Sequence, residues 1–219
     1  MMKKLLTGLV LLAILISIFV CSTALLNSQP KETISINESE LVFEAYREFL
    51  KGERNVIFHE QTIGINKIIS SEMEIDRNYN ARYALFDTNG DGLPELHILS
   101  QNHYYILSFK DGNLIVWAEL TPYYEQLNNR AFLHIRPGGT PLHISSIYIV
   151  MDFSGNEMVR IFFEKYDIDE NGVYDDNDRY FFEDVEVSKK DWDTLTEKYL
   201  SIGSDQIKWF DYSEGEPAF

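Results

Sequence analysis

The sequence predicts an α+β fold in which a helix near each end of the chain packs on an antiparallel β-meander of about seven to nine strands. Three observations support this fold class. A stretch near residue 40 places apolar residues at helical spacing and ends at Gly52. From Ala81 onward, short runs of aromatic and β-branched residues alternate with turn formers, which is typical of strands. Ser188, followed three residues later by Asp191, indicates the start of a second helix.

The first thirty residues have the composition of a secretory leader. Met-Met-Lys-Lys precedes an apolar run from Leu5 to Val20, which is typical of an export signal. Cys21 ends this run at the place where bacterial lipoproteins carry their lipidated cysteine. Cleavage after Ala24 and an uncleaved anchor spanning Leu5 to Leu26 are the alternatives. All three interpretations place the folded part outside the cytoplasmic membrane, either secreted or anchored to the outer face of that membrane.

The chain divides into a leader at residues 1–24, a short tether at 25–37 and a single domain at 38–215. The folded part has about 190 residues, a usual size for one domain with its own core. Cys21 is the only cysteine, so an internal disulfide is excluded and the core depends on packing and on any bound metal.

The chain is strongly acidic, with a formal net charge of −16. Nucleic-acid binding requires Lys and Arg to neutralise phosphates, so we expect no nucleic-acid partner. Direct attraction to anionic lipid headgroups is disfavoured for the same reason, and we expect membrane contact only through the leader or a lipid. Divalent cations are natural partners of such a charge. The alternative interpretation is that excess Asp and Glu only keep the protein soluble.

The first helix is predicted to begin at Asn37, which can cap it with Glu40, and to end at Gly52. Its apolar face is expected to contain five residues: Leu41, Val42, Ala45, Tyr46 and Phe49. Residues 53–80 are ambiguous, with a possible helix around Ile65 to Met73. The late helix begins at Ser188 and is expected to share a face among Trp192, Leu195 and Tyr199.

The predicted strands lie between these helices, with one more near the C-terminus. Lys110-Asp111-Gly112-Asn113 contains Asp-Gly and predicts a hairpin between two of them. The expected strands are Tyr83–Phe86, Leu96–Leu99, Tyr104–Phe109, Leu114–Leu120, Ala131–Ile135, Ile144–Phe153, Met158–Tyr166, Tyr180–Val187 and Ile207–Tyr212.

A loop between the first two expected strands reads D-T-N-G-D-G-L-P-E and has the spacing of a calcium loop. Side-chain oxygens occupy positions 1, 3, 5 and 9, and Gly92 at position 6 permits the sharp turn that such a loop needs. Position 12 is Ile98, so Glu95 must serve in place of the usual glutamate at that position. The predicted ligands are Asp87, Asn89, Asp91, the carbonyl oxygen of Leu93, and Glu95.

This first loop resembles the D-x-D-x-D-G-x-x-D loops of integrin-type and other extracellular calcium repeats, a resemblance that covers some nine residues. Asn-Gly and Asp-Gly also make good turns. The alternative is therefore a simple turn that joins two strands without an ion.

A second candidate loop follows at residues 167–178, with Gly172 at position 6. Asn171 stands at position 5, which lowers the charge but keeps an oxygen. Its neighbours Asp176 and Asn177 leave open that this is only an acidic loop. The predicted ligands are Asp167, Asp169, Asn171, the carbonyl oxygen of Val173, Asp175 and Asp178.

The sequence contains no recognisable catalytic motif: G-x-S-x-G, H-E-x-x-H and a phosphate-binding glycine loop are absent. We expect His97, His103, His134 and His143 to be packed or solvent-facing rather than metal ligands. Aromatic residues make up 14% of the chain, and we expect most to lie in the core or on the sheet. Exposed ones such as Trp117, Tyr123 and Tyr124 are candidates for a sugar-stacking or protein-binding surface.

Together with the leader, three segments resemble a group of exported bacterial proteins described as calcium-binding or EF-hand-like lipoproteins. These segments are Ala45–Gly52, Tyr83–Leu96 and Tyr104–Gly112, and the likeness covers about half of the chain. The resemblance implies export and calcium without implying an activity. Our leading hypothesis is a non-enzymatic surface domain, stabilised by structural calcium, that binds a protein or glycan. The rival is a calcium-stabilised extracytoplasmic hydrolase acting on envelope or environmental polymers.

Overall fold

The structure is a computed structural model, and the part of the chain that it describes begins at residue 36. The predicted leader, most of the tether, and Cys21 lie outside it. The described residues are 36–69, 81–127, 130–137, 142–201, 207–212, 217 and 219.

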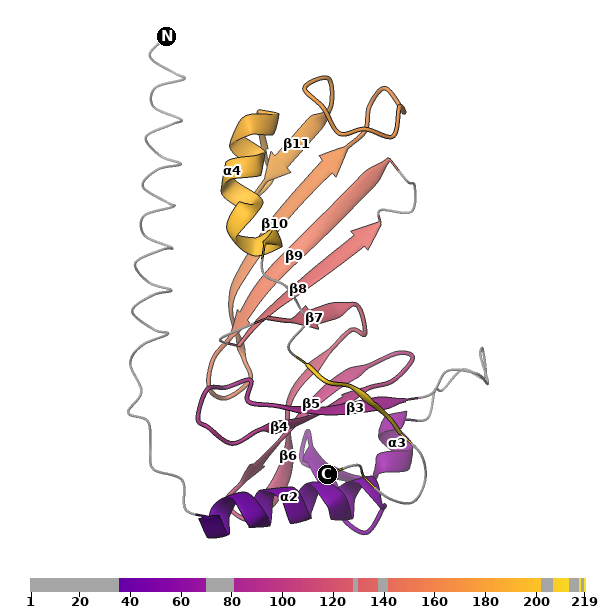
Figure 1. Ribbon diagram of the computed structural model, residues 1–219, viewed down its shortest axis with the longest axis vertical. Coiled ribbons are helices and arrows are strands. Elements are labelled where there is room, and N and C mark those ends of the chain that lie inside the picture. The colour runs from indigo at the N-terminus through magenta and orange to yellow at the C-terminus, as the bar shows by residue number, and fades with distance from the viewer. Residues whose placement is uncertain are drawn as a thin grey trace. The chain divides into compact units, whose positions relative to one another are not determined.

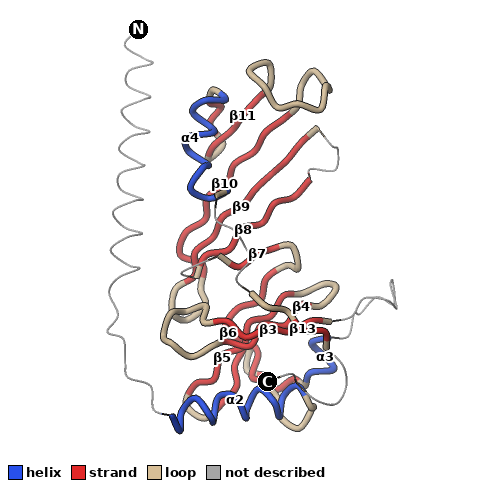
Figure 2. The backbone as a smooth tube through the Cα atoms, viewed as in Figure 1, coloured by secondary structure: helices blue, strands red, loops and turns tan. Residues whose placement is uncertain are grey.

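The predicted α+β class is confirmed, with helices near both ends of the described chain and β-strands between them (Figures 1 and 2). The helices are α2 (Ile36–Leu50), α3 (Ile65–Ile69) and α4 (Lys189–Leu200). The strands form two sheets and not the single meander that the sequence predicts. The first sheet has the order β13 (Phe210–Asp211), β3 (Arg82–Phe86), β4 (Glu95–Leu99), β5 (Tyr104–Lys110), β6 (Asn113–Leu120), β1 (Val56–Phe58) and β2 (Gln61–Ile63).

The second sheet is antiparallel throughout, whereas the first is mixed because β1 pairs with β6 in parallel. Pro122 follows the end of β6 and has no N–H group for a ladder bond, so the chain leaves the first sheet there and enters the second. The second sheet has the order β12 (Val185–Val187), β11 (Arg179–Phe182), β10 (Glu157–Tyr166), β9 (His143–Met151), β8 (Ala131–Pro137) and β7 (Tyr124–Gln126).

The predicted hairpin at Asp111-Gly112 is confirmed. Both turn residues have positive φ, 51° and 79°, as a two-residue type I′ connection requires. The predicted strand Tyr180–Val187 is instead two strands, because Glu183 and Asp184 adopt positive φ and fold β12 back on β11. The predicted last strand is shorter, since only Phe210 and Asp211 pair with β3. Helix α3 occupies the start of the predicted second helix, and the remainder of that prediction lies outside the described residues.

Helix α2 packs on the first sheet and forms one core with it. Val42, Tyr46 and Phe49 are at most 2% exposed and lie against Leu96, Ile98 and Leu107 of the sheet, among other residues. The prediction that Leu41 shares this face is wrong, because its side chain is 61% exposed. The helix is rotated so that the i, i+4, i+7 row beginning at Val42 faces inward.

A second core joins the two sheets. Trp117 of β6 is buried there with Phe132 and Ile149 of the second sheet. Its indole Nε1 donates a 3.0 Å hydrogen bond to the carbonyl oxygen of Phe153 in the turn between β9 and β10. In the same turn, a methyl group on Gly155 would overlap the carbonyl oxygen of Trp117. The expectation that Trp117 is an exposed aromatic is therefore wrong.

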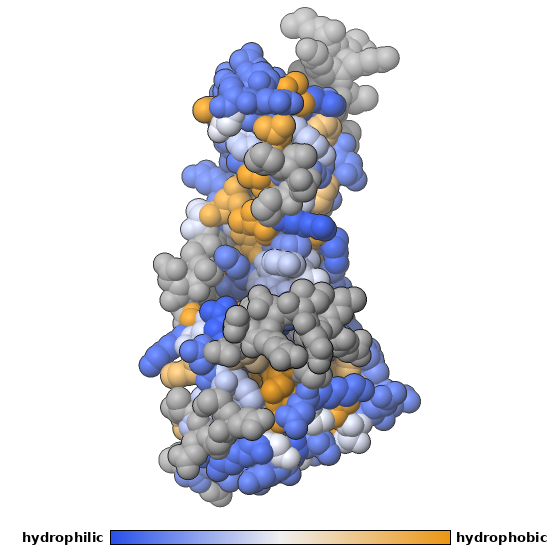
Figure 3. Space-filling view, turned by 90° about the vertical axis from the view of Figure 1, so that its right-hand side faces the viewer, coloured by the Kyte–Doolittle hydropathy of each residue, from blue (hydrophilic) through white to orange (hydrophobic). Residues whose placement is uncertain are grey.

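Helix α4 begins as predicted, with Ser188 as its N-cap accepting a hydrogen bond from the backbone N–H of Asp191. Trp192 and Tyr199 are buried and contact the aromatic ring of Phe163 in the second sheet. No helix in the described part of the chain is both long and apolar enough to span a membrane. The face seen in Figure 3 is mostly hydrophilic, with small hydrophobic patches.

Candidate metal-binding loops

The first loop, Asp87–Glu95, connects two strands that pair directly beside it. Phe86 of β3 is paired with Glu95 of β4, so the ninth loop residue already belongs to a strand. Ile98, at position 12, lies inside β4 and is 1% exposed, which prevents it from facing the loop. Tyr46 of α2 donates a 3.0 Å hydrogen bond to the carbonyl oxygen of Pro94 and ties the end of the loop to the helix.

The side chains of the first loop fold inward onto its own backbone. The Asp87 carboxylate accepts hydrogen bonds from the N–H groups of Gly90, at 2.8 Å, and Gly92, at 3.0 Å. Asp91 Oδ1 accepts from the N–H of Leu93 at 2.8 Å. These bonds curl the loop around its own side chains. Among the described residues, the carboxylates clustered closely enough to hold a metal ion do not include Asp87, Asp91 or Glu95.

Glu95 is 1% exposed and takes three donors from the loop. Its Oε2 accepts from the N–H groups of Thr88, at 2.7 Å, and Asn89, at 3.3 Å. Its Oε1 accepts from the amide Nδ2 of Asn89 at 2.6 Å. The same Nδ2 donates to Asp91 Oδ2 at 2.9 Å. A donor group thus lies between two carboxylates, while Asn89 Oδ1 accepts from the backbone N–H of Asp91 at 2.7 Å.

The second loop comprises the twelve residues Asp167–Asp178, between the paired residues Tyr166 and Arg179. It is drawn in orange at the end of the second sheet in Figure 1. Asp167, Asp169 and Asp178 each offer a carboxylate oxygen, and these atoms lie within 4.8 Å of one another. Asp167 is buried and Asp169 is exposed. The three carboxylates can hold a metal ion.

Asn171 and Asp175, two further predicted ligands of the second loop, form hydrogen bonds within the loop. Asn171 Oδ1 accepts from the N–H of Val173 at 2.7 Å, and its Nδ2 donates to Asp169 Oδ2 at 2.9 Å. The backbone N–H of Asp175 donates to Asp178 Oδ2 at 2.7 Å. The Asp175 carboxylate accepts from the N–H of Asn177, and it is not among the three clustered carboxylates.

The two loops share a backbone conformation that their sequences do not reveal. Position 4 has positive φ in both, 80° at Gly90 and 58° at Glu170, and so does the glycine at position 6. In both, the carboxylate at position 1 accepts from the N–H group at position 6, at 3.0 Å from Gly92 and 2.7 Å from Gly172. The first and second loops therefore have the same local architecture.

The N–H group at position 2 also meets a distal carboxylate in each loop. Thr88 donates to Glu95 at 2.7 Å, and Ile168 donates to Asp178 at 2.8 Å. Glu95 at position 9 thus makes the contact in the first loop that Asp178 at position 12 makes in the second. That Glu95 serves as a metal ligand in place of the residue at position 12 stays a prediction.

Three carboxylates of the loops, Asp87, Glu95 and Asp169, have raised pKa values. Burial, reinforced by the nearby charge of Asp91, raises the pKa of Glu95 to about 8. Burial also raises the pKa of Asp87. Desolvation within the loop raises the pKa of the exposed Asp169, and the charges of Asp178 and Asp175 add to this. Each shift has the sign expected where negative charge is crowded and incompletely solvated. A cation placed among these oxygens would reverse it.

A buried polar chain, which the sequence analysis did not anticipate, leads from the first loop into the molecule. His97 is 0% exposed, with Nε2 2.8 Å from Thr88 Oγ1 and Nδ1 2.7 Å from the Tyr104 hydroxyl. Thr88 in turn donates to Gln126 Oε1 at 3.3 Å. These partners assign the proton to Nε2, because Tyr104 then donates to Nδ1. Burial lowers the pKa of His97 to about 3, so the ring is neutral.

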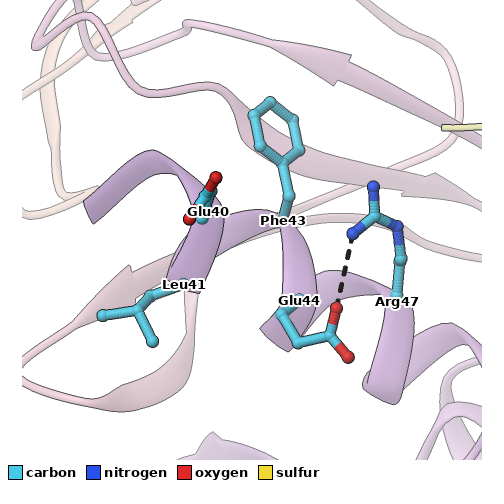
Figure 4. Close-up of a pocket in the computed structure, with 5 residues that line it drawn as sticks. All are labelled: Glu40, Leu41, Phe43, Glu44 and Arg47. Atoms are coloured by element: carbon cyan, nitrogen blue, oxygen red, sulfur yellow. Dashed lines mark hydrogen bonds and ion pairs between the residues drawn. The ribbon is translucent and has the colours of Figure 1, made fainter. Parts of the chain in front are cut away.

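A hollow on α2 contrasts with the loops (Figure 4). The described residues that line it all belong to α2, and among them Arg47 pairs with Glu44 at 3.3 Å along the helix surface. The labelled side chains do not converge on a common point. It is a surface feature without the chemistry of a site.

Comparisons with protein-family models, with curated proteins and with solved structures find no match.

Proposed function

We propose that this chain is an exported calcium-binding domain whose two loops each hold a structural calcium ion and whose surface binds a partner outside the cytoplasmic membrane. The observation that carries the proposal is the shared conformation of the two loops. Both follow D-x-[ND]-x-[DN]-G, both have positive φ at positions 4 and 6, and both bring a distal carboxylate to the N–H at position 2.

Calcium is favoured over other metals by the ligands that the loops offer. All predicted ligand atoms are oxygens, from carboxylates, amides and backbone carbonyls, which suits a hard cation with six to eight ligands. Magnesium requires a stricter octahedral geometry at shorter distances. The part of the chain that the structure describes contains no cysteine, so soft thiolate ligands are not available there.

An exported domain would meet calcium outside the cell, and the bound ion would stabilise its fold. The leader resembles that of exported bacterial lipoproteins, and calcium sites in extracellular modules bind with dissociation constants of about 0.1 to 1 mM. At tenfold saturation, binding to the folded form alone contributes about 1.4 kcal/mol per loop. This is a useful share of a folding stability of about 5 to 15 kcal/mol, in a chain without an internal disulfide.

A binding role is better supported than hydrolysis. A hydrolase of polymers needs carboxylates of altered acidity in a cleft away from the calcium loops. Among the described residues, the carboxylates with raised pKa values are Asp87, Glu95 and Asp169, and all three lie in the loops.

The test is thermal unfolding of the mature domain in 5 mM calcium, in chelator, and in magnesium. Calcium should raise the melting temperature over chelator by about 3 to 6 °C for each occupied loop. Asp87→Asn and Asp167→Asn should each remove about half of the increase, because each removes the charge at position 1 of one loop. The double variant should remove nearly all of it.

Two controls make the result specific. Asp111→Asn removes the same charge in the turn between β5 and β6, away from both loops, and should leave the calcium effect unchanged. Magnesium should produce a clearly smaller rise than calcium. If melting is the same in calcium and in chelator, neither loop stabilises the fold through calcium and the proposal is wrong.

A further inference from the structure

A cleft where the two sheets meet is lined by aromatic and charged side chains. It has a volume of about 550 Å³, within the usual range of small-ligand sites. Arg82 of β3 and Trp209 border it from the first sheet side, and the segment around β7 borders it from the other. We call it the aromatic cleft and define it by Arg82, Tyr104, Tyr123, Tyr124, Glu125 and Trp209.

Neighbouring groups hold the aromatic rings of the cleft in place. The Tyr104 ring meets Trp209 edge-on at 5.8 Å, and its hydroxyl is fixed by His97 at 2.7 Å. The guanidinium of Arg82 lies 5.6 Å from the centre of the Trp209 ring. Tyr104 itself is 1% exposed, so a ligand would meet the edge formed by Trp209 and Arg82, whose orientation is set before binding. This lowers the entropy cost of association.

Tyr123 is the exposed platform of this surface. Its side chain is 68% exposed although one face of its ring stacks on His134, with centroids 5.7 Å apart and planes 12° apart. The other face of a ring stacked in this way remains available to a ligand. A solvent-facing tyrosine, held flat by a neighbour, presents an apolar surface with a hydroxyl at its edge.

A second hollow, of about 390 Å³, continues the cleft beyond Tyr123. It shares Tyr123 and Ile135 with the cleft and adds Thr121, His134 and Arg136. The Nε2 atom of His134 is buried and, among the residues that the structure describes, has no hydrogen-bond partner. The surface thus suits a ligand with several units in a row.

The chemistry of this surface matches a sugar chain. Pyranose rings have an apolar C–H face that packs on an aromatic ring, and hydroxyls around their edge that bind charged groups. The Arg82 guanidinium only donates hydrogen bonds and the Glu125 carboxylate only accepts them. Together they can bind a sugar hydroxyl both as an acceptor and as a donor. Because their charges are opposite, the cleft favours a neutral ligand. A polyanion is disfavoured by the net charge of −16.

We propose that the aromatic cleft binds a neutral oligosaccharide, with Tyr123 as the stacking platform and Arg82 and Glu125 as hydroxyl-binding groups. This names the partner class of the binding role proposed above. It rests on that role but not on calcium, because the six cleft residues are distinct from the predicted ligands of both loops.

The test is a glycan array probed with the mature domain, followed by calorimetric titration of a neutral oligosaccharide that it retains. Tyr123→Ala should weaken binding about tenfold, the effect of losing one aromatic platform. Tyr123→Phe should stay within a few-fold of wild type because the ring remains. Glu125→Gln should weaken binding through loss of the charged acceptor. Leu41→Ala, at a side chain that is 61% exposed on α2, is the matched control and should have no effect.

Tyr123 and Glu125 are chosen because both side chains are exposed, so their variants should fold. Trp209→Ala serves only as an additional test, because Trp209 also packs in the core between the sheets and its loss affects folding as well. The proposal is overturned if the folded domain retains no neutral glycan, or if Tyr123→Ala and Glu125→Gln bind as wild type does. Retention of peptides instead of glycans overturns it as well. Glycan binding by a domain whose melting ignores calcium would reject only the calcium proposal, and the converse result would reject only the sugar site.

Discussion

Glu95 is a carboxylic acid whose side chain is 1% exposed, at the end of the first loop beside helix α2. Its raised pKa arises chiefly from burial, and the charges of Asp91 and Asp87 add to it. Three donors from Thr88 and Asn89 offset part of this cost. In the metal-free chain the Glu95 carboxyl is therefore protonated near neutral pH. A bound cation would stabilise the carboxylate, lower its pKa and so release the proton.

The acidity of Glu95 predicts an unusual pH dependence. Its pKa rises from an ordinary 4.5 to about 8 on folding, so the folded chain holds a proton that the unfolded chain has released between these values. This contribution to stability is complete below about pH 4.5 and is lost as pH rises toward 8. Urea unfolding in chelator should thus show a negative slope of stability against pH in this window, relative to Glu95→Gln.

Calcium should cancel this pH dependence in the first loop. Binding displaces the proton from Glu95, so the calcium affinity should increase with pH up to about 8. Equal pH slopes in wild type and Glu95→Gln, with and without calcium, would show that Glu95 does not titrate in this window.

At the residue scale, the sequence indicates the tight turns of the first loop well because their signals are local. Asp87, Asn89 and Asp91 alternate along a tight turn, and the structure curls them as the motif predicts. The polar chain from Thr88 through His97 to Tyr104 was not predictable. It depends on which strands pair, and Thr88 meets Gln126 across 38 residues of sequence.

At the element scale, the hairpin of β9 and β10 is fixed to β6 at one point. Its turn residue Gly155 has φ of 81° and lies against the backbone of Trp117. Phe153, two residues earlier, accepts the indole hydrogen bond and carries the guanidinium of Arg130 3.7 Å from its ring centre. The packing of the second sheet on β6 therefore depends on the contact between Gly155 and the Trp117 backbone, which leaves no room for a side chain at residue 155.

Gly155→Ala should be strongly destabilising. Alanine at positive φ costs about 1 kcal/mol, and overlap with the Trp117 carbonyl adds about 1 to 3 kcal/mol by forcing the sheets apart. The control is Gly112→Ala, because Gly112 has nearly the same φ of 79° but open space around the added methyl group. Equilibrium unfolding in urea should separate the two variants by at least about 1 kcal/mol. Equal losses would mean that the contact with Trp117 contributes nothing.

Most elements were predictable because their signals lie within a few residues. The Ser188 cap and the Asp111-Gly112 turn are confirmed on local chemistry alone. The turn at Glu183 and Asp184 was missed since neither residue is a glycine or asparagine, although both adopt positive φ. The short strands β1 and β2 were missed because three residues are too few to show a period.

At the scale of the whole molecule, the α+β class follows from the order of elements but the division into two sheets does not. The decisive features are the parallel pairing of Ile57 with Ile115 and the exit from the first sheet at Pro122. Each sheet carries one loop with the D-x-[ND]-x-[DN]-G pattern, and each loop joins two strands that pair with each other. The aromatic cleft, formed where the sheets meet, was likewise not predictable, although Tyr123 and Tyr124 were singled out as candidate binding residues.

The central claim is that two loops of one architecture hold calcium, and a crystal structure of the mature domain grown in excess calcium tests it most directly. Anomalous scattering should show one ion in each loop. In the first, oxygens of Asp87, Asn89, Asp91, Leu93 and Glu95 should lie about 2.4 Å from the ion. In the second, the cluster of Asp167, Asp169 and Asp178 should contact the other ion. Crystals in calcium with both loops empty of any anomalous peak would contradict the account.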